Sequence, residues 1–325
     1  MRPSCHSCRF HCLDRPGEVT IGDFWGIEKY SSIDPRGGVS LVLVRDDQEE
    51  LIDALGCEMA IEEHEIPHAV NERQPTLSHP MLAHAGRAGF FAALQKKGFS
   101  RAMFEVYAKS FLRKFLPKGR RVSVKNSRNI AADVVFPDGT LLKNRLVQST
   151  TDCCGCGTCS LVCPMGAISM ERDNEGFVYP RIDEEKCTNC SLCEAACSFA
   201  LDKKASVTKP GIRVFAAVHH DVKVKSSSSS GGAFWALASY ALDQEGVVYG
   251  CSFDADLNPR HIRCETLSDV KKCQGSKYAQ SDSFTVFEGV KKDLKQGKTV
   301  LFSGTPCQVA ALKHYLKIKK LGIGD

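Results

Sequence analysis

Two short cysteine runs carry the strongest chemical signal in the sequence. They read CCGCGTCSLVCP at residues 153–164 and CTNCSLCEAACS at residues 187–198. In each run four cysteines follow the spacing C-x2-C-x2-C-x3-C. Three thiolates at these intervals can wrap one corner of an iron–sulfur cubane, and the fourth lies beyond that loop. Zinc sites more often use two separated C-x2-C pairs. The runs therefore predict iron–sulfur chemistry.

The pairing of the runs predicts which cysteines act together. In the bacterial two-cluster ferredoxin pattern, the fourth cysteine of each run ligates the cluster of the other run. We call the two predicted ligand groups the first set and the second set. The first set is Cys153, Cys156, Cys159 and Cys197, and the second set is Cys187, Cys190, Cys193 and Cys163. Gly155 and Gly157 would let backbone N–H groups approach the sulfurs. Cys154 lies outside the spacing and is interpreted as a bystander.

Composition indicates a soluble globular protein. The 325 residues are 43% hydrophobic and 25% charged, and 17 are cysteines, which favours metal ligation in a reducing compartment. No apolar run reaches the roughly 20 residues that cross a bilayer, and no signal peptide opens the chain. We therefore expect a cytoplasmic protein without a membrane span. Two thiolate-bound clusters would add about −4 to the formal charge of +5. Lys and Arg are also scattered, so we expect no nucleic-acid partner.

The last third contains a turn of small residues. SSSSSGG at residues 226–232 precedes the helical stretch AFWALASYAL. Such a turn at a helix start can hold a phosphate or another anion, although composition alone favours a flexible linker. GVVYGCSF at residues 246–253 predicts a strand, and QGSKYAQSD at residues 274–282 predicts a polar loop.

A strand, a tight turn and a helix are predicted within residues 297–316, GKTVLFSGTPCQVAALKHYL. The helix is expected to begin at Gln308, which places Cys307 at a strand-to-helix turn where α/β proteins commonly build sites. A helix end lowers a thiol pKa, but a buried structural thiol is an equal alternative. The cysteines without metal spacing are expected in the core; they are Cys57, Cys251, Cys264 and Cys273.

The first third has strand patterns around VTIGDF and GVSLVLV and a helical pattern from about residue 85 to 115. A basic segment and a weak strand and turn, VVFPDGTLL, follow. Cys5 and Cys8, which we call the N-terminal pair, form an isolated C-x2-C, and Cys12 extends it to C-x2-C-x3-C. Two alternatives are open for the pair. One is a zinc site completed by Cys12 and His11, and the other is that the cysteines are free surface thiols.

Several of these motifs resemble the coenzyme F420 hydrogenase/dehydrogenase beta subunit family. RPSCHSCRF, TIGDFWGI and GVSLVLV are similar to its C-terminal domain, and SSSGGAFWAL, GSKYAQSD and LFSGTPCQVAALK are similar to its N-terminal domain. In many bacterial members a two-cluster ferredoxin domain precedes that N-terminal domain. The segments stand here in a different order, and the family's middle segment is missing.

The resemblance implies a mixed α+β and α/β fold, with a ferredoxin-like dicluster domain flanked by two partial α/β domains. We expect a C-terminal-like domain over residues 1–118, a linker over 119–147, the ferredoxin domain over 148–205 and an N-terminal-like domain over 206–325.

The resemblance also implies cofactors. Family members bind iron–sulfur clusters and FAD. By analogy the N-terminal pair would share a third 4Fe-4S cluster with Cys307, and Cys12 is a candidate fourth ligand. The residues expected near a flavin or nucleotide are Ser229, Gly231, Gly232, Lys277, Tyr278 and Asp23, with Trp25 beside them. A turn role is the alternative for Asp23.

Three functions are consistent with the sequence. The first is an oxidoreductase subunit that passes electrons between two 4Fe-4S clusters, FAD and a deazaflavin or other acceptor, together with a redox partner or second subunit. No catalytic dyad is identified, and none is required if a flavin carries the chemistry. The second is a ferredoxin-type electron carrier with incomplete, non-catalytic flanks. The third is a fragment or fusion, which would expose apolar surface and aggregate.

Overall fold

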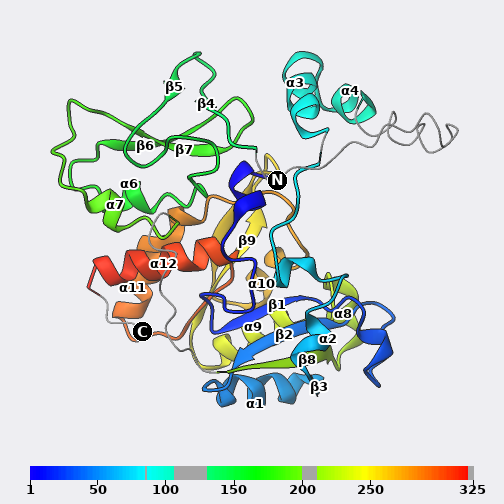
Figure 1. Ribbon diagram of the computed structural model, residues 1–325. Helices are drawn as coiled ribbons and strands as arrows, with labels where there is room; N and C mark the ends of the chain where they lie inside the picture. Colours follow the sequence, from blue (N-terminus) through cyan, green and yellow to red (C-terminus); the bar gives the residue numbers. More distant parts are fainter. Residues whose placement is uncertain (85, 106–129, 200–210, 321–325) are drawn as a thin grey trace, which may run out of the picture.

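The computed structural model describes residues 1–84, 86–105, 130–199 and 211–320. Its elements are a four-stranded sheet, a three-stranded sheet, two hairpins and the helices around them (Figure 1). The chain is therefore a mixed α/β protein, as the sequence predicted. In the described part of the chain, no helix is long and apolar enough to cross a membrane.

The four-stranded sheet joins segments that are far apart in the sequence. Its order is β1-β2-β8-β3, and all its neighbours are antiparallel. The strands are β1 Val19–Asp23, β2 Ser40–Arg45, β8 Ile212–His219 and β3 Met59–His64. The two strands predicted in the first third are confirmed as β1 and β2. Because β8 lies between β2 and β3, the segments expected to form two separate flanking domains share one sheet.

Both faces of this sheet are covered. Helices α1 (Glu49–Glu58) and α9 (Ala233–Asp243) pack on Val42, Val44 and Phe215. The opposite face buries Leu41 and Leu43, and the short α2 (Ile66–Ala69) lies on that side. Successive residues of β2 point to opposite faces, so the unbroken apolar run SLVLV fits a strand buried on both sides.

The three-stranded sheet has the order β10-β9-β11, with β9 antiparallel to β10 and parallel to β11. Its strands are β9 Val247–Phe253, β10 Pro259–Cys264 and β11 Val300–Phe302. The helices around it are α10 Leu267–Cys273, α11 Phe287–Lys295 and α12 Pro306–Ile318. The strand predicted at 246–253 and the helix after SSSSSGG are confirmed as β9 and α9.

Two local predictions in the last third are wrong. Helix α12 begins at Pro306 rather than Gln308, because Thr305 and Gln308 form a capping box and proline suits the first helical position. Residues 226–232 are not a flexible linker. They complete the short α8 (Val222–Ser227) and then pack against the sheet, where Ser230 Oγ donates to Val39 O at 2.8 Å.

The cysteine runs lie in a third region, drawn green in Figure 1, which sits above α11 and α12. Its strands are β4 Val134–Val135, β5 Leu141–Leu142, β6 Ile168–Arg172 and β7 Val178–Ile182. Its helices are α6 Thr158–Val162 and α7 Leu192–Ala195. Helices α3 (Arg87–Lys97) and α4 (Phe99–Met103) confirm part of the helical pattern predicted from residue 85, while residues 85 and 106–115 lie outside the described residues.

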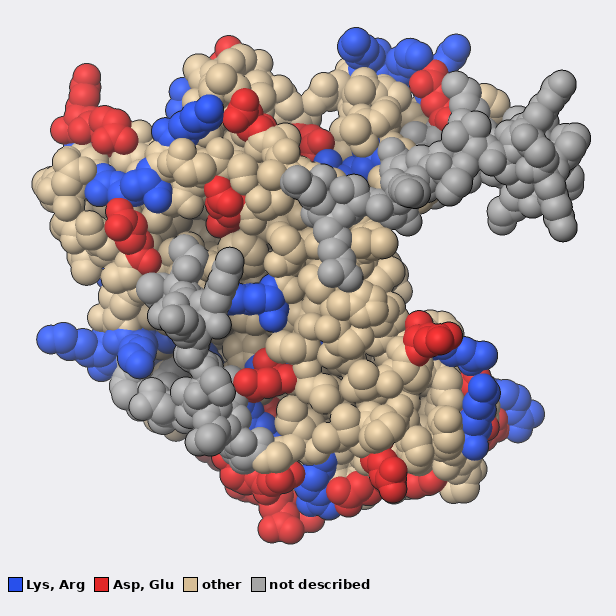
Figure 2. Space-filling model, in the orientation of Figure 1, with Lys and Arg blue, Asp and Glu red and all other residues tan. Residues whose placement is uncertain are grey.

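Charge is mixed on the surface. On the face drawn in Figure 2, the Lys and Arg side chains that the structure describes alternate with Asp and Glu around the rim. Ion pairs such as Arg213–Glu63 and Lys313–Glu18 explain part of this alternation.

Candidate iron–sulfur centre

The first set is held by a tight loop that leads into α6. Gly155 and Gly157 have φ of +71° and +73°, a left-handed backbone that favours glycine. The backbone N–H of Gly155 donates to Cys153 Sγ at 3.2 Å. This is the donor pattern expected around a cluster ligand, because it stabilises the thiolate.

The four thiols of the first set lie around one buried point. Burial raises the pKa of Cys159 well above its ordinary value, and the negative charges of Cys156, Cys153 and Cys197 raise it further. Burial likewise raises the pKa of Cys153 to about 11. Cys156 and Cys159 are each only 9% exposed. The four therefore lie near one another, although they come from two runs.

The second set surrounds a cavity close to the surface. Cys163, Cys187, Cys190 and Cys193 all line it. The N–H of Ala167 donates to Cys163 Sγ at 3.3 Å, and Arg145 Nη2 donates to Cys187 Sγ at 2.8 Å.

The backbone of the loop around this cavity has an unusual conformation at two residues. Asn189 and Ser191 have φ of +55° and +60°, which non-glycine residues rarely adopt. Strained backbone of this kind gathers at ligand sites. The cavity, the backbone and the N–H donors all fit a bound 4Fe-4S cluster, whose chemistry is the exchange of one electron.

Single metal ions are a poorer fit. Across the described ranges, no three His, Cys, Asp or Glu side chains lie close enough together to hold one ion. The thiolates of a cubane surround four iron atoms and so stand farther apart than the ligands of one zinc ion. The zinc alternative for Cys12, His11 and the N-terminal pair therefore lacks a preformed site.

The N-terminal pair lies beside Cys307. Burial raises the pKa of Cys5, and the negative charge of Cys307 raises it further. Burial raises the pKa of Cys8 to about 11, with added contributions from Cys307, Cys5 and Cys12. Residues separated by about 300 positions thus share one neighbourhood.

Cys154 is the residue that sequence reasoning undervalued. It is 5% exposed, and its thiol lies close enough to Cys156 and Cys307 for both to raise its pKa. A hydrogen bond from Cys154 lowers the pKa of Cys307, as does one from Thr305. Adjacent side chains on an extended loop point in opposite directions, which was the available signal. Cys154 therefore lies between Cys156 of the first set and Cys307.

The residues expected near a flavin are brought together only in part. Ser229 Oγ accepts from the N–H of Ser276 at 2.7 Å, so the SSSSSGG and GSKYAQSD segments do meet. Gly232 caps α9 with φ of +96°, and a Cβ on Gly231 would collide with Ala217 O. These two glycines therefore have structural reasons of their own.

The remaining candidates are Lys277, Tyr278, Asp23 and Trp25. Lys277 Nζ donates to Gln274 O at 2.6 Å, within its own loop, and Tyr278 is 95% exposed. Asp23 ends β1, where its backbone carbonyl accepts from Gln74 Nε2 at 2.6 Å, and Trp25 is 58% exposed.

The other cysteines divide between core and surface. Cys264 and Cys273 are buried, as predicted, with their Sγ atoms 3.8 Å apart, and Cys251 is half-buried. The prediction for Cys57 is wrong. It lies on the face of α1 that points to solvent, because Ile52 and Leu55 occupy the face that packs on the sheet.

Comparison with known proteins gives matches that centre on the cysteine runs. Residues 152–201 match the model of the 4Fe-4S dicluster domain family. A stretch of 45 residues is 47% identical to a component of the Na⁺-translocating ferredoxin:NAD⁺ oxidoreductase complex of Acetobacterium woodii, covering 14% of this chain and 12% of that one. A stretch of 52 residues is 42% identical to an uncharacterised ferredoxin of Methanocaldococcus jannaschii, covering 16% of this chain and 66% of the relative.

A longer match extends beyond the runs. Over 200 residues the chain is 26% identical to an uncharacterised protein of Methanocaldococcus jannaschii, covering 52% of this chain and 54% of the other. The chain thus spans about half of this relative and a small part of the Acetobacterium protein. Together the matches and the two converging cysteine sets establish that the chain contains a 4Fe-4S dicluster ferredoxin domain with an electron-transfer function.

Proposed function

We propose that this chain is an oxidoreductase subunit in which the first and second sets each hold a 4Fe-4S cluster and link a redox partner protein to a flavin or deazaflavin. The observation that carries the proposal is the different position of the two sets. The second set is open to the surface, whereas the first set is enclosed against α12 and the cysteines around Cys307.

The second set supplies the accessible end. Cys190 is exposed, and two apolar side chains at the cavity are exposed as well, Met165 at 51% and Leu192 at 39%. An apolar rim around a redox centre is what a transient protein partner can dock on. The name of the Acetobacterium relative, a component of a ferredoxin:NAD⁺ oxidoreductase complex, supports a protein partner of this kind.

The first set supplies the interior end. Cys156 belongs to the same buried cluster as Ala311 and Leu312 of α12, and Thr158 Oγ1 donates to Ala311 O at 3.5 Å. The chain therefore surrounds this set with protein on the side that leads to Cys307.

The four thiols at this interior end support a third 4Fe-4S cluster. We propose that Cys154 is the fourth ligand beside Cys307 and the N-terminal pair. Cys154 reaches Cys307 directly, whereas the Cys12 thiol donates to the Asp14 carbonyl at 3.1 Å. Cys154 is therefore a better candidate than Cys12.

We place the proposed flavin where the SSSSSGG and GSKYAQSD segments meet. The resemblance to the coenzyme F420 hydrogenase/dehydrogenase beta subunit family motivates it, and the contact between Ser229 and Ser276 supports it. The residues proposed to line that site are Ser229, Gly231, Gly232, Lys277, Tyr278 and Asp23. A second subunit could complete it.

A ferredoxin-type carrier without flavin is the second candidate function. It is favoured by the matches at 47% and 42% identity, which extend over only 45 and 52 residues. Bound flavin separates the two functions, since a simple carrier would show no flavin absorbance after purification.

The test is iron, acid-labile sulfide and flavin per chain after anaerobic purification. Two clusters give about 8 iron atoms and three give about 12. Iron well below 8 would refute the two-cluster proposal. If iron is near 12, Cys154→Ala is expected to lower it to about 8, while the buried control Cys264→Ala leaves it unchanged. An unchanged value in Cys154→Ala would exclude this residue as a ligand.

A further inference from the structure

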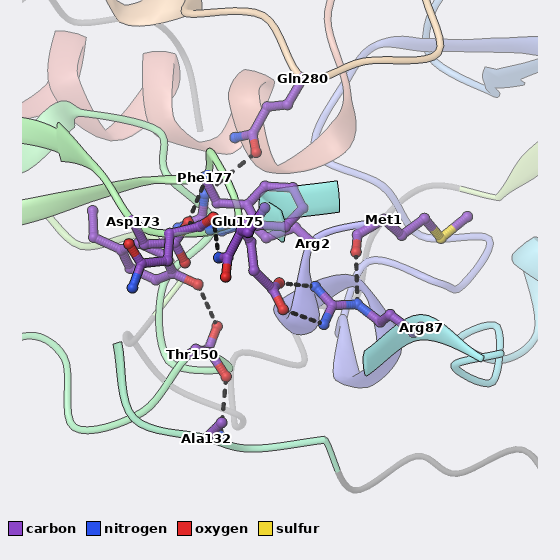
Figure 3. A network of polar contacts seen from close by, with 12 residues as sticks. Met1, Arg2, Arg87, Ala132, Thr150, Asp173, Glu175, Phe177 and Gln280 are labelled. Atoms are coloured by element: carbon purple, nitrogen blue, oxygen red, sulfur yellow. Dashed lines mark hydrogen bonds and ion pairs between the residues drawn. The ribbon is translucent and has the colours of Figure 1, made fainter. Parts of the chain in front are cut away.

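Arg2 is the most deeply buried cation that the structure describes near either set. Its residue is 3% exposed, and its guanidinium lies over the Tyr179 ring at 4.1 Å and within 5.7 Å of the Phe177 ring centre. Nε donates to Cys153 O at 2.7 Å, Nη2 donates to Val178 O at 2.7 Å and Nη1 reaches Gln280 Oε1 at 3.4 Å (Figure 3).

All three of these acceptors are neutral. No ion pair to Arg2 is found among the described residues, so its charge is buried without a bonded carboxylate. Asp173 is a buried carboxyl that could neutralise Arg2. Burial raises the pKa of Asp173, and the nearby charge of Arg2 lowers it. Its carboxylate, however, accepts from the backbone N–H groups of Glu175 and Phe177. A buried guanidinium in this position is costly unless an anion lies close by.

The first set provides that anion. Arg2 Nε donates to the backbone carbonyl of Cys153, the first residue of this set, so the guanidinium lies directly beside the loop that would hold the cluster. Gly155 leaves room for the arginine, since a Cβ there would lie 2.6 Å from Arg2 Nη1. The loop that carries the first set is thus shaped around the guanidinium.

Arg87 provides an internal comparison. It lies beside the same aromatic group, but its guanidinium pairs with Glu175 and its Nε donates to Met1 O at 3.3 Å (Figure 3). Its charge is therefore neutralised locally. At the second set, Arg145 donates to Cys187 Sγ but also lies 3.7 Å from Glu194 and is partly exposed. Its charge is screened by a carboxylate and by water.

We infer that Arg2 is the built-in counter-charge of the first set and raises the reduction potential of the centre held there relative to that of the second set. Reduction adds negative charge, and a fixed buried cation favours the more negative state. This inference rests on the proposed assignment of the two sets. It gives the electron path a direction, inward from the exposed second set.

The test is a potentiometric titration monitored by EPR on the full chain. The first and second sets are each expected to show a one-electron step. The step of the first set is identified as the one that is lost in Cys159→Ala and survives in Cys190→Ala. In Arg2→Met, the ratio of reduced to oxidised first-set centre at a fixed potential should fall about tenfold, equivalent to about 59 mV. Arg2→Lys should stay close to wild type, and so should Arg87→Met.

The possible results separate the role of Arg2 from the proposed function. Absence of two 4Fe-4S signals in the wild type would overturn the proposed function itself. Two normal signals with an unchanged first-set step in Arg2→Met would overturn only the role of Arg2, as would an equal shift of both steps. If Arg2→Met fails to load iron, Arg2→Gln and Arg2→Lys are compared. Loading by Arg2→Lys alone supports a requirement for the charge. Failure of Arg2→Lys as well means that the side chain acts through packing, and the inference is wrong.

Discussion

The first and second sets share one cysteine spacing but differ in their surroundings, although each contains a buried thiol. The first set packs against α12 through Cys156; Cys156 and Cys159 are each 9% exposed, and the buried Arg2 lies beside Cys153. The second set opens to solvent at Cys190 and has a partly exposed arginine paired with Glu194. Spacing therefore specifies the ligands, while the packing around each run decides what its centre can contact.

The largest expected contrast comes from removing one ligand of each set. Cys159→Ala leaves a buried gap and an incomplete first set, so we expect iron to fall by about 4 atoms per chain and the domain to unfold in part. Cys190→Ala should cost the same iron but leave the fold intact, because Cys190 is exposed. Iron analysis and far-ultraviolet circular dichroism measure the two effects.

Equal loss of structure in both variants would contradict the comparison. It would mean that the clusters, rather than the packing of the first set on α12, hold the region together. Cys57→Ala, at an exposed thiol of α1, is the control and should change neither iron content nor structure.

A second contrast compares two glycines: Gly157 in the first run, and Gly166 in the turn that follows the run. A Cβ on Gly157 would collide with the Phe284 ring, and its φ is +73°. Gly166 has φ of +58° but nothing within 4 Å of the added Cβ. We expect Gly157→Ala to lower the free energy of unfolding by about 3 kcal/mol and Gly166→Ala by about 1 kcal/mol. Denaturant titration of the iron-loaded proteins measures both.

The difference between the two variants isolates the packing. Both substitutions carry the same left-handed backbone cost, so the excess at Gly157 reports the contact between the first run and the last third. If the two values agree, Phe284 moves aside freely and the first set is less tightly enclosed than its burial indicates.

Much of the local structure could be predicted from the sequence. The four-cysteine runs predicted which thiols converge, because their spacing is dictated by the size of a cubane. The branched and aromatic patterns predicted β1, β2 and β9 for the same kind of reason, since alternation along a strand is local. Cys264 and Cys273 were correctly expected in the core.

The remainder depended on contacts between distant parts of the chain. No local pattern says that β8 inserts between β2 and β3, because strand neighbours are chosen by the assembled core. Cys57 was misassigned because the residue type alone does not show whether a cysteine is buried. The face of α1 that packs on the sheet must be known first. Arg2 was not singled out and Cys154 was interpreted as a bystander, because their partners lie 176 and 153 residues away, at Val178 and Cys307.

The smallest expected effect on stability tests the accessible end. Leu192 is 39% exposed at the cavity of the second set, and Leu141 on β5 is a control at 58% exposure. Each leucine-to-serine change should alter the free energy of unfolding by no more than about 0.5 kcal/mol, because little apolar area is lost. Leu192→Ser should nevertheless slow reduction by a ferredoxin-type protein donor about threefold, which corresponds to under about 1 kcal/mol of docking energy. Stopped-flow absorbance measures the rate, and reduction by dithionite, which needs no docking surface, should be unchanged. A protein-donor rate that falls equally in Leu141→Ser, or in neither variant, would mean that partners reach the chain elsewhere, and the second set would lose its role as the place where electrons arrive.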